Sequence, residues 1–129
     1  MTPQEQADFV RSNHHAVLIT RRRDDRVQSS PIVCGADDEG RILISVTAHR
    51  AKTKNIRRDP RVALCVLPDA FFGDWTQIDG TAEIVELPDA MPGLESVYRQ
   101  VQGEHPNWDE FRAAMHRDDR CLVRITISG

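Results

Sequence analysis

The stretch "ILISVTAHRAKTKNIRRDPRVALCV", residues 42–66, joins two apolar segments through a short and strongly basic one. The apolar segments, 41–47 and 61–67, are rich in β-branched residues and predict strands. The segment 48–59 between them has a helical pattern, which ends before Pro60 because the residue preceding a proline is disfavoured in the α region. The stretch therefore predicts a strand, a basic helix and a second strand.

The positive charges of this predicted helix divide into two groups. Four of them recur at helical spacing and share one broad face: Arg50, Lys54, Arg57 and Arg58. Solvated charge is the default expectation for such a face. Lys52 lies instead four residues before Ile56, the large apolar residue of the segment, so we expect Lys52 on the side that faces the protein.

A phosphate is the ligand that best fits Lys52 in that position. The first turn of a helix offers free N–H groups and a partial positive charge. Ser45 and Thr47, at the end of the preceding strand, add hydroxyl donors. The alternative is a local salt bridge, or a lysine whose stem covers apolar surface while its ammonium reaches water. The sequence favours the phosphate and leaves the alternative open.

The rest of the chain predicts a mainly β fold. Thr2 and Glu5 form a capping box that starts a helix. We expect helices over 3–12, 48–59, 89–102 and 107–118, the last capped by Asn107, and strands over 16–20, 27–36, 41–47, 61–67, 75–87 and 121–127. Pro31 indicates a bulge or an edge position, and Gly80 a kink. About six antiparallel strands then predict a small β-barrel with flanking helices, in one domain spanning residues 1–129.

Composition limits the class of function. The chain has 129 residues, 40% of them hydrophobic and 29% charged, and a net charge of −3. These values fit a soluble folded domain and argue against general affinity for nucleic acid. No apolar run approaches the ~18 residues of a membrane span, and the polar amino terminus is unlike a secretory signal, so we expect a cytoplasmic protein without a membrane partner.

The cysteines and histidines predict neither disulfides nor a metal centre. Cys34, Cys65 and Cys121 are far apart and lie in apolar runs, so we expect buried free thiols in a reducing compartment. The adjacent His14 and His15 point to opposite sides if they begin a strand, which does not suit a shared metal ion.

No motif of protein-based catalysis occurs in the sequence: it has no Ser-His-Asp order, paired carboxylates, P-loop or GxGxxG pattern. Trp75, Gln77 and Asp79 share one face of their predicted strand, where the indole can flank a planar ring or fill the core. The segment "QSSP", 28–31, offers hydroxyl and amide groups but is more typical of a strand edge. Any redox chemistry would therefore come from a cofactor.

The order of these features resembles the pyridoxamine 5′-phosphate oxidase-like split β-barrels, which bind flavin or deazaflavin. The resemblance rests on residues 42–66, on the hairpin "QSSPIVCGADDEGRILIS" before them and on the strand "QIDGTAEIVE" after them, and it covers residues 8–127. Within the family, "RAKTKN" and "VYRQVQGEHPNWDEFRAAM" are most similar to the actinobacterial branch that uses coenzyme F-420, a deazaflavin.

The resemblance implies a role for each matching position. Lys52 resembles the lysine that holds the cofactor phosphate, with Arg50 and the backbone of Ala51 at neighbouring contact positions. The strand end that borders the phosphate and the ribityl chain corresponds to Ser45, Val46 and Thr47. The strand that lies against the ring corresponds to Gln28, Ser29, Ser30, Pro31 and Ile32. Trp75 matches a position near the ring or phosphate, often contributed by the second subunit of a homodimer with its cofactor sites at the interface.

The implied function is that of an oxidoreductase that uses reduced coenzyme F-420 to transfer a hydride to a small unsaturated or quinone-like acceptor. The resemblance implies no catalytic side chain, because the cofactor carries the hydride. F-420 has a phosphodiester and a glutamate tail, so Lys54 and the rest of the outer basic face are expected to meet the tail carboxylates. FMN is the alternative cofactor, in a flavin reductase or oxidase, although such oxidases commonly have Arg-Lys where this chain has Ala51-Lys52. A third reading is a deazaflavin-binding protein without turnover.

Overall fold

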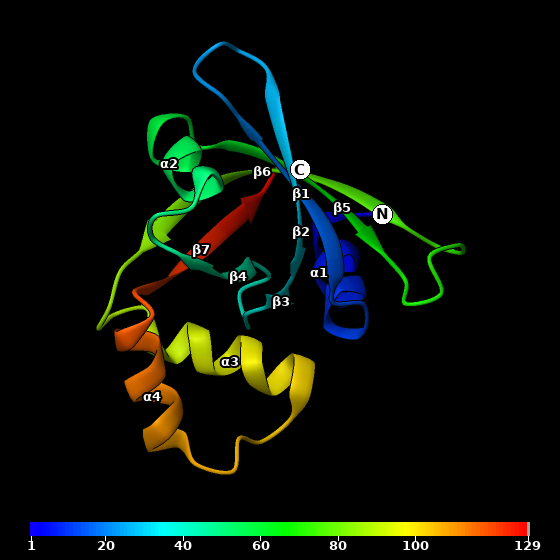
Figure 1. Ribbon diagram of the computed structural model, residues 1–129. Helices are drawn as coiled ribbons and strands as arrows, with labels where there is room; N and C mark the ends of the chain where they lie inside the picture. Colours follow the sequence, from blue (N-terminus) through cyan, green and yellow to red (C-terminus); the bar gives the residue numbers. More distant parts are fainter. Residues whose placement is uncertain (129) are drawn as a thin grey trace.

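The computed structural model describes residues 1–128, in which one antiparallel sheet is flanked by four helices (Figure 1). The elements are α1 (Pro3–Ser12), β1 (His15–Arg21), β2 (Val27–Val33), β3 (Gly35–Ala36), β4 (Ile42–Thr47), α2 (Ala51–Arg58), β5 (Arg61–Leu67), β6 (Thr76–Val85), α3 (Met91–Gln102), α4 (Trp108–Arg117) and β7 (Arg120–Ile127). Hydrogen bonds order the strands β2-β1-β5-β6-β7-β4-β3. The prediction of a mainly β, antiparallel fold with flanking helices is confirmed.

The sheet curls into a barrel that is split between β2 and β4. Four strands separate these two in the hydrogen-bonding order, yet their residues lie in contact. α3 and α4 cover the outer face of β4 and β7, while α2 follows the carboxyl end of β4 and lies against β1 and β6 (Figure 1). This arrangement brings the edge strand β2, the end of β4 and the basic helix α2 to one region.

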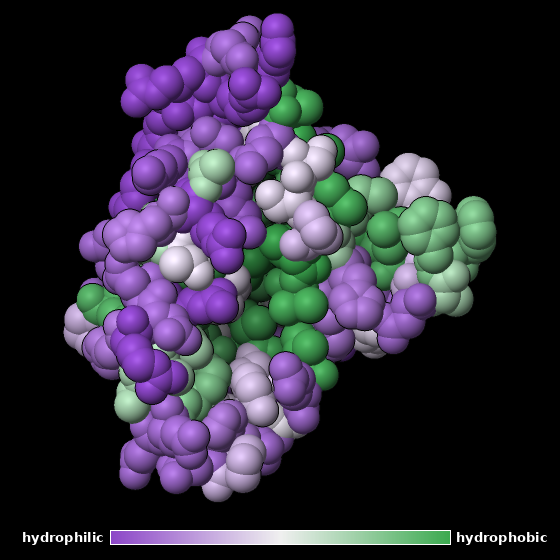
Figure 2. Space-filling model, viewed as in Figure 1, coloured by the Kyte–Doolittle hydropathy of each residue, from purple (hydrophilic) through white to green (hydrophobic). Residues whose placement is uncertain are grey.

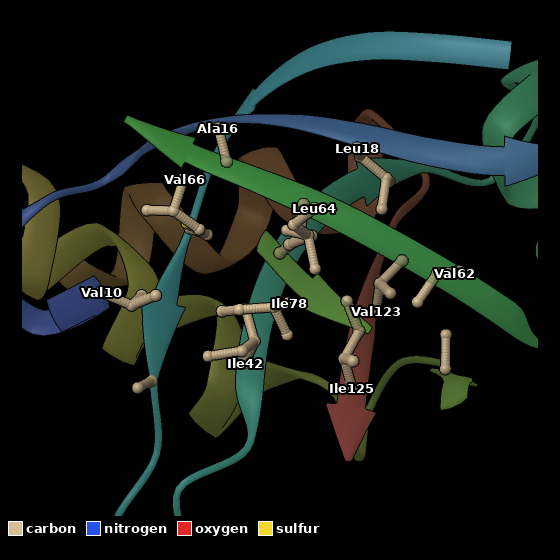
Figure 3. Packing of buried hydrophobic residues seen from close by; sticks show 14 of the residues in the cluster. Val10, Ala16, Leu18, Ile42, Val62, Leu64, Val66, Ile78, Val123 and Ile125 are labelled. Carbon is tan, nitrogen blue, oxygen red and sulfur yellow. The ribbon is translucent and has the colours of Figure 1, made fainter. Parts of the chain in front are cut away.

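The inside of the curled sheet is the main hydrophobic core. Burial alternates strictly along β1 and β5, as expected for strands with one face inward. Leu18, Leu64, Ile78, Val123 and Ile125 meet there from four strands and are fully buried (Figure 3). Burying each of these side chains contributes about 1.5–3 kcal/mol, which fixes the inward register of the strands.

A second cluster lies on the outer face of β4 and β7. Leu43 and Leu122 point away from the barrel interior and pack with Leu94, Val97 and Phe111 of the helix pair α3–α4. β4 and β7 are therefore buried on both faces. This explains why "ILISV" and "CLV" read as nearly continuous apolar runs.

The predicted strand over residues 27–36 is wrong in one respect, because it is two strands. β2 pairs with β1 alone and is the edge of the sheet, as Pro31 indicated, whereas β3 pairs with β4. The chain switches partners at Cys34, whose N–H donates to the carbonyl of His14 at 2.8 Å. The side-chain amide of Gln100 accepts from the N–H of Ala36 at 3.0 Å and donates to its C=O at 2.9 Å. It thereby makes the two hydrogen bonds that a neighbouring strand would make to β3.

The strand β6 runs unbroken from Thr76 to Val85, through Gly80, where the sequence predicts a kink. Gly80 pairs with Val62 on one side and Ile127 on the other. A Cβ at this position would lie 2.6 Å from the carbonyl oxygen of Thr126. Glycine is thus required here for the close approach of β7.

The helix boundaries follow the predicted caps. Thr2 and Glu5 form the expected capping box, and the Asn107 side chain accepts from the N–H of Glu110 at 3.1 Å. α2 is shorter than predicted, because a turn closed by the N–H of Arg50 and the carbonyl of Thr47 precedes it. No helix within residues 1–128 combines the length and the apolar character needed to cross a membrane.

The three cysteines are free thiols, as predicted. Cys34 and Cys121 are buried in the core, whereas Cys65 is only half-buried, which corrects the prediction for that residue. Burial raises the pKa of the Cys34 thiol to about 12.

Candidate cofactor site

The short helix α2 is fixed to both sides of the split in the barrel. Its buried Asn55 donates from Nδ2 to Gln28 Oε1 of β2 at 3.0 Å and to Thr20 Oγ1 of β1 at 3.2 Å. Its buried Thr53 donates from Oγ1 to the carbonyl of Thr47, the last residue of β4, at 2.8 Å. The predicted site segments on β2, β4 and α2 are therefore brought together by specific hydrogen bonds.

Lys52 is half-buried at the start of α2, beside the inward residues Thr53 and Ile56. Burial is the main cause that lowers the pKa of its ammonium, and the charges of Arg50 and Arg120 lower it further. Within residues 1–128 the Lys52 side chain has no ion pair or hydrogen bond, so the salt-bridge alternative finds no support there. A partly desolvated cation among other cations is an arrangement that an anionic ligand would relieve.

Arg120 is a residue of this region that the sequence reasoning missed. It begins β7 and lies opposite Thr47 in the β4–β7 register. Its Nε is buried and has no hydrogen-bond partner within residues 1–128. A lone basic residue before an apolar strand gives no local signal of a site, because only the cross-strand register places it beside the end of β4.

A cleft of about 820 Å³ opens between α2 and the β1–β2 hairpin. Basic side chains form most of its wall: Arg22, Arg23, Lys54, Arg57 and Arg58, together with Gln28, Ala51 and Asn55. The outer face of the helix is only partly free. Arg57 donates to Glu86 at 2.9 Å, and Arg58 donates to the carbonyl of Arg21 at 2.6 Å. The turn "RRRDDR", residues 21–26, contributes Arg22 and Arg23 to this cleft.

The predicted contact residues on the strands differ in which way they face. On β2, Ser29 and Pro31 are exposed, whereas Gln28, Ser30 and Ile32 are half-buried on the inward side. On β4, Ser45 and Thr47 point outward. Val46 is buried in the core at 1% exposure, so it offers a ligand only its backbone.

The remaining predicted residues on and near α2 are accessible from the cleft or its rim. Arg50 is the exposed N-cap residue, Ala51 and Lys54 line the cleft, and no described acidic group pairs with either Arg50 or Lys54. Twelve of the thirteen predicted residues thus lie on β2, β4 and the start of α2.

Trp75 is the exception, because it lies at the opposite end of the barrel. It precedes Thr76, which pairs with Val66 at the end of β5, while α2 leads into the beginning of β5 at Arg61. A strand of this length separates the two ends by about 20 Å. One chain therefore does not place Trp75 beside Lys52, and only a second chain can bring the indole to the site.

Exposed aromatic side chains cluster around Trp75 at the tip of the β5–β6 hairpin. Phe71 and Phe72 stack edge to face, and Phe72 and Trp75 are 83% and 58% exposed. Figure 2 shows this hairpin as an apolar lobe that projects from the right of the molecule. An apolar hollow between β1, β2 and the end of β5 adds Val17, Pro31, Ile32, Val33 and Leu67 to the surface. Apolar groups in such number on one surface are typical of protein–protein contact.

Together these features define the class of protein: a split β-barrel whose basic helix follows the fourth strand and lies across the split. The sequence model of the family described as "Pyridoxamine 5'-phosphate oxidase" matches residues 2–129. The chain belongs to the pyridoxamine 5′-phosphate oxidase family.

Solved structures share this fold. Conserved hypothetical protein Rv2991 from Mycobacterium tuberculosis is 29% identical, with a TM-score of 0.81, over 100% of this chain and 82% of that one. An F420 reductase is 22% identical, with a TM-score of 0.71, over 95% and 92% of the two chains. A heme-binding protein from Mycobacterium smegmatis is 15% identical, with a TM-score of 0.69, over 99% and 52%. At 22% and 15% identity, the last two structures show a similarity of fold alone.

Proposed function

We propose that this protein is an oxidoreductase that uses reduced coenzyme F-420, with a small unsaturated or quinone-like molecule as the acceptor. The observation that supports this most strongly is the half-buried Lys52, whose side chain is unpaired within residues 1–128. Its neighbours on α2, Ala51 and Lys54, line a cleft walled by further cations. The family includes oxidoreductases, and an F420 reductase shares the fold. Sequence composition and the free cysteines favour a cytoplasmic location.

The donor groups of the region suit a phosphate. Lys52 would hold it, with the hydroxyls of Ser45 and Thr47 and the free N–H groups of the first turn of α2 as further donors. Exposed residues of β2, chiefly Ser29 and Pro31, would lie against the ring. A flavin phosphate carries at most about two negative charges, and the cleft offers more positive charge than that. The excess favours the longer anionic tail of F-420 over FMN.

When bound, the reduced deazaflavin supplies a hydride from its C5 to an electron-poor acceptor. The residues of the chain bind and orient the two partners and exclude water between them, which is catalysis by positioning. We assign no described side chain to proton transfer. Two chains would complete each site, because Trp75 lies at the far end of the barrel from Lys52 and the aromatic hairpin is exposed. The proposal therefore includes a homodimer with its cofactor sites at the interface.

A fluorescence titration of the purified apo-protein with oxidised F-420, and separately with FMN, at fixed salt tests this function. We expect tight binding of F-420 and weak binding of FMN. The reverse order would make the protein a flavin enzyme, and binding of neither would contradict both. Turnover of the reduced coenzyme with a panel of enones and quinones then distinguishes an enzyme from a protein that only binds the deazaflavin.

A further inference from the structure

The guanidinium of Arg120 has no protein group among residues 1–128 to receive its hydrogen bonds. Arg120 is half-buried at the start of β7, and its Nε is inaccessible to solvent. Within residues 1–128 none of its side-chain nitrogen atoms has a hydrogen bond or an ion pair. Buried N–H groups in proteins are nearly always paired, so an unpaired one in such a position points to a missing acceptor.

The charges around Arg120 also indicate a missing anion. Arg50, Lys52 and Arg120 lie close enough that the two arginines disfavour the charged form of the lysine. The acidic residues just before β7 are engaged elsewhere: Asp119 with His49 at 2.9 Å and Asp118 with Arg117 at 3.7 Å. Three cations thus meet without a carboxylate among the described residues to balance them.

There is also room for ligand atoms beside the guanidinium. A cavity of about 240 Å³ lies between part of the outer face of β4 and the helix pair α3–α4, and Arg120 is the charged residue of its lining. Ser45 of β4 opens into the same cavity, as do Tyr98 and Met115 of the helices. Arg120 is therefore shared between the cation cluster at α2 and a cavity into which a predicted cofactor contact, Ser45, already points.

We propose that Arg120 is a second phosphate-binding residue, which meets from β7 the same phosphate that Lys52 holds from α2. The planar guanidinium offers two parallel N–H donors that match two oxygens of a phosphate, whereas the lysine acts as a point charge. The phosphate would then lie between α2 and β7, across the end of β4. This inference rests on the proposed function and names a residue of the same site.

The test compares phosphate-bearing and phosphate-free ligands in Arg120→Gln, Arg120→Lys and Arg124→Gln. Arg124 is the matched control, since it lies on the same face of β7 and is half-buried but is balanced by Glu83 at 2.7 Å. We expect Arg120→Gln to weaken F-420 binding about tenfold or more and to leave binding of the tail-free, phosphate-free deazaflavin within about twofold. Arg120→Lys should retain part of the affinity, and Arg124→Gln all of it.

Equal losses for the two ligands, or equal losses in the Arg124 control, would overturn the proposal. A double-mutant cycle with Lys52→Met adds a second criterion: if both residues bind one phosphate, the double mutant loses less than the product of the single losses. Circular dichroism of each variant establishes that it is folded.

A second readout keeps this inference separate from the proposed function. Inorganic phosphate, compared with chloride at equal ionic strength, should raise the melting temperature of the wild type and of Arg124→Gln more than that of Arg120→Gln. If no deazaflavin or flavin binds but this difference is found, the phosphate site stands and the cofactor proposal fails. If phosphate stabilises all three proteins equally, the role of Arg120 is refuted.

Discussion

Asn55 and Gln28 join the basic helix to the edge strand, through a hydrogen bond of 3.0 Å from Nδ2 to Oε1. Asn55 is 8% exposed, and its side chain also donates to Thr20 and accepts from Arg58 at 3.1 Å. One buried amide therefore holds β1, β2 and α2 in a fixed relation. Since β2 is an edge strand, this bond sets the distance between the two predicted halves of the cofactor site.

Replacing Asn55 by Ala should lower the free energy of unfolding by about 1–3 kcal/mol. The reason is that the buried polar groups that bond to the amide would be left without a hydrogen-bond partner. Urea denaturation measures the loss. Lys54→Ala, at an exposed position of the same helix, is the matched control and should change stability by no more than about 0.5 kcal/mol. Equal stability of the two variants would mean that the amide network contributes nothing to fixing α2.

The affinity for a phosphate-bearing cofactor should fall at alkaline pH through Lys52. Burial and two neighbouring cations lower the pKa of this ammonium in the free protein, and a bound anion would raise it again. Well below the pKa that Lys52 has in the free protein, the affinity is then independent of pH. As the pH rises through that pKa, affinity falls and binding takes up protons. Calorimetry in two buffers of different ionisation enthalpy measures this uptake.

Lys52→Arg is the control for this pH dependence, because a guanidinium stays charged across the same range. The variant should bind with a flat alkaline profile. A wild-type profile that is equally flat would show that Lys52 does not meet the anion.

Arg23 and Lys54 should bind the carboxylates of the F-420 tail. Both line the cleft, and their side chains have no ion pair or hydrogen bond within residues 1–128, whereas Arg57 and Arg58 also stabilise the helix. The double variant Arg23→Ala/Lys54→Ala should bind the full coenzyme about 2- to 30-fold more weakly, since each exposed ionic contact contributes about 0.2–1 kcal/mol. Binding of a tail-free analogue should not change.

Salt and a neighbouring arginine provide the controls for the tail prediction. High salt should abolish the difference between wild type and double variant, because these contacts are exposed. Arg26→Ala, in the same β1–β2 turn but outside the cleft lining, should bind both ligands as the wild type does. Equal weakening for tailed and tail-free ligands would contradict a tail-binding role.

The aromatic hairpin should be part of a dimer interface. Phe72→Asp places a charge on a side chain that is 83% exposed in one chain, so the fold should persist. Burial of a Phe side chain contributes about 1.5–3 kcal/mol, and its loss should weaken dimerisation by at least about tenfold. Light scattering after gel filtration, over a range of protein concentrations, measures the shift toward a single-chain mass.

Asp74→Asn, in the same hairpin, is the matched control and should leave the dimer intact. A wild type that is monomeric at high concentration would contradict the interface. So would a Phe72→Asp variant whose mass is unchanged. A monomeric variant that still binds cofactor with full affinity would show that Trp75 of a second chain takes no part in the site.

The sequence by itself determined the elements whose signals are local. The capping box at Thr2, the cap at Asn107 and the stop at Pro60 each act through neighbours a few residues away, and the strands follow from alternating or continuous apolar runs. The basic helix after the fourth strand was predictable for the same reason. With the resemblance to known split barrels, these elements sufficed to predict the fold. They also indicated the segments of the candidate cofactor site, which stays a prediction.

Only the tertiary structure decided how those segments meet. It placed Arg120 opposite Thr47, added Arg22 and Arg23 to the cleft, turned Val46 into the core and put Trp75 at the far end of the barrel. It also showed that Gly80 serves close strand approach and that Gln100 completes the sheet edge. These facts depend on strand register and on contacts between residues far apart in the chain. Local propensity and periodicity do not encode such relations, because they arise only when the curled sheet brings distant strands together.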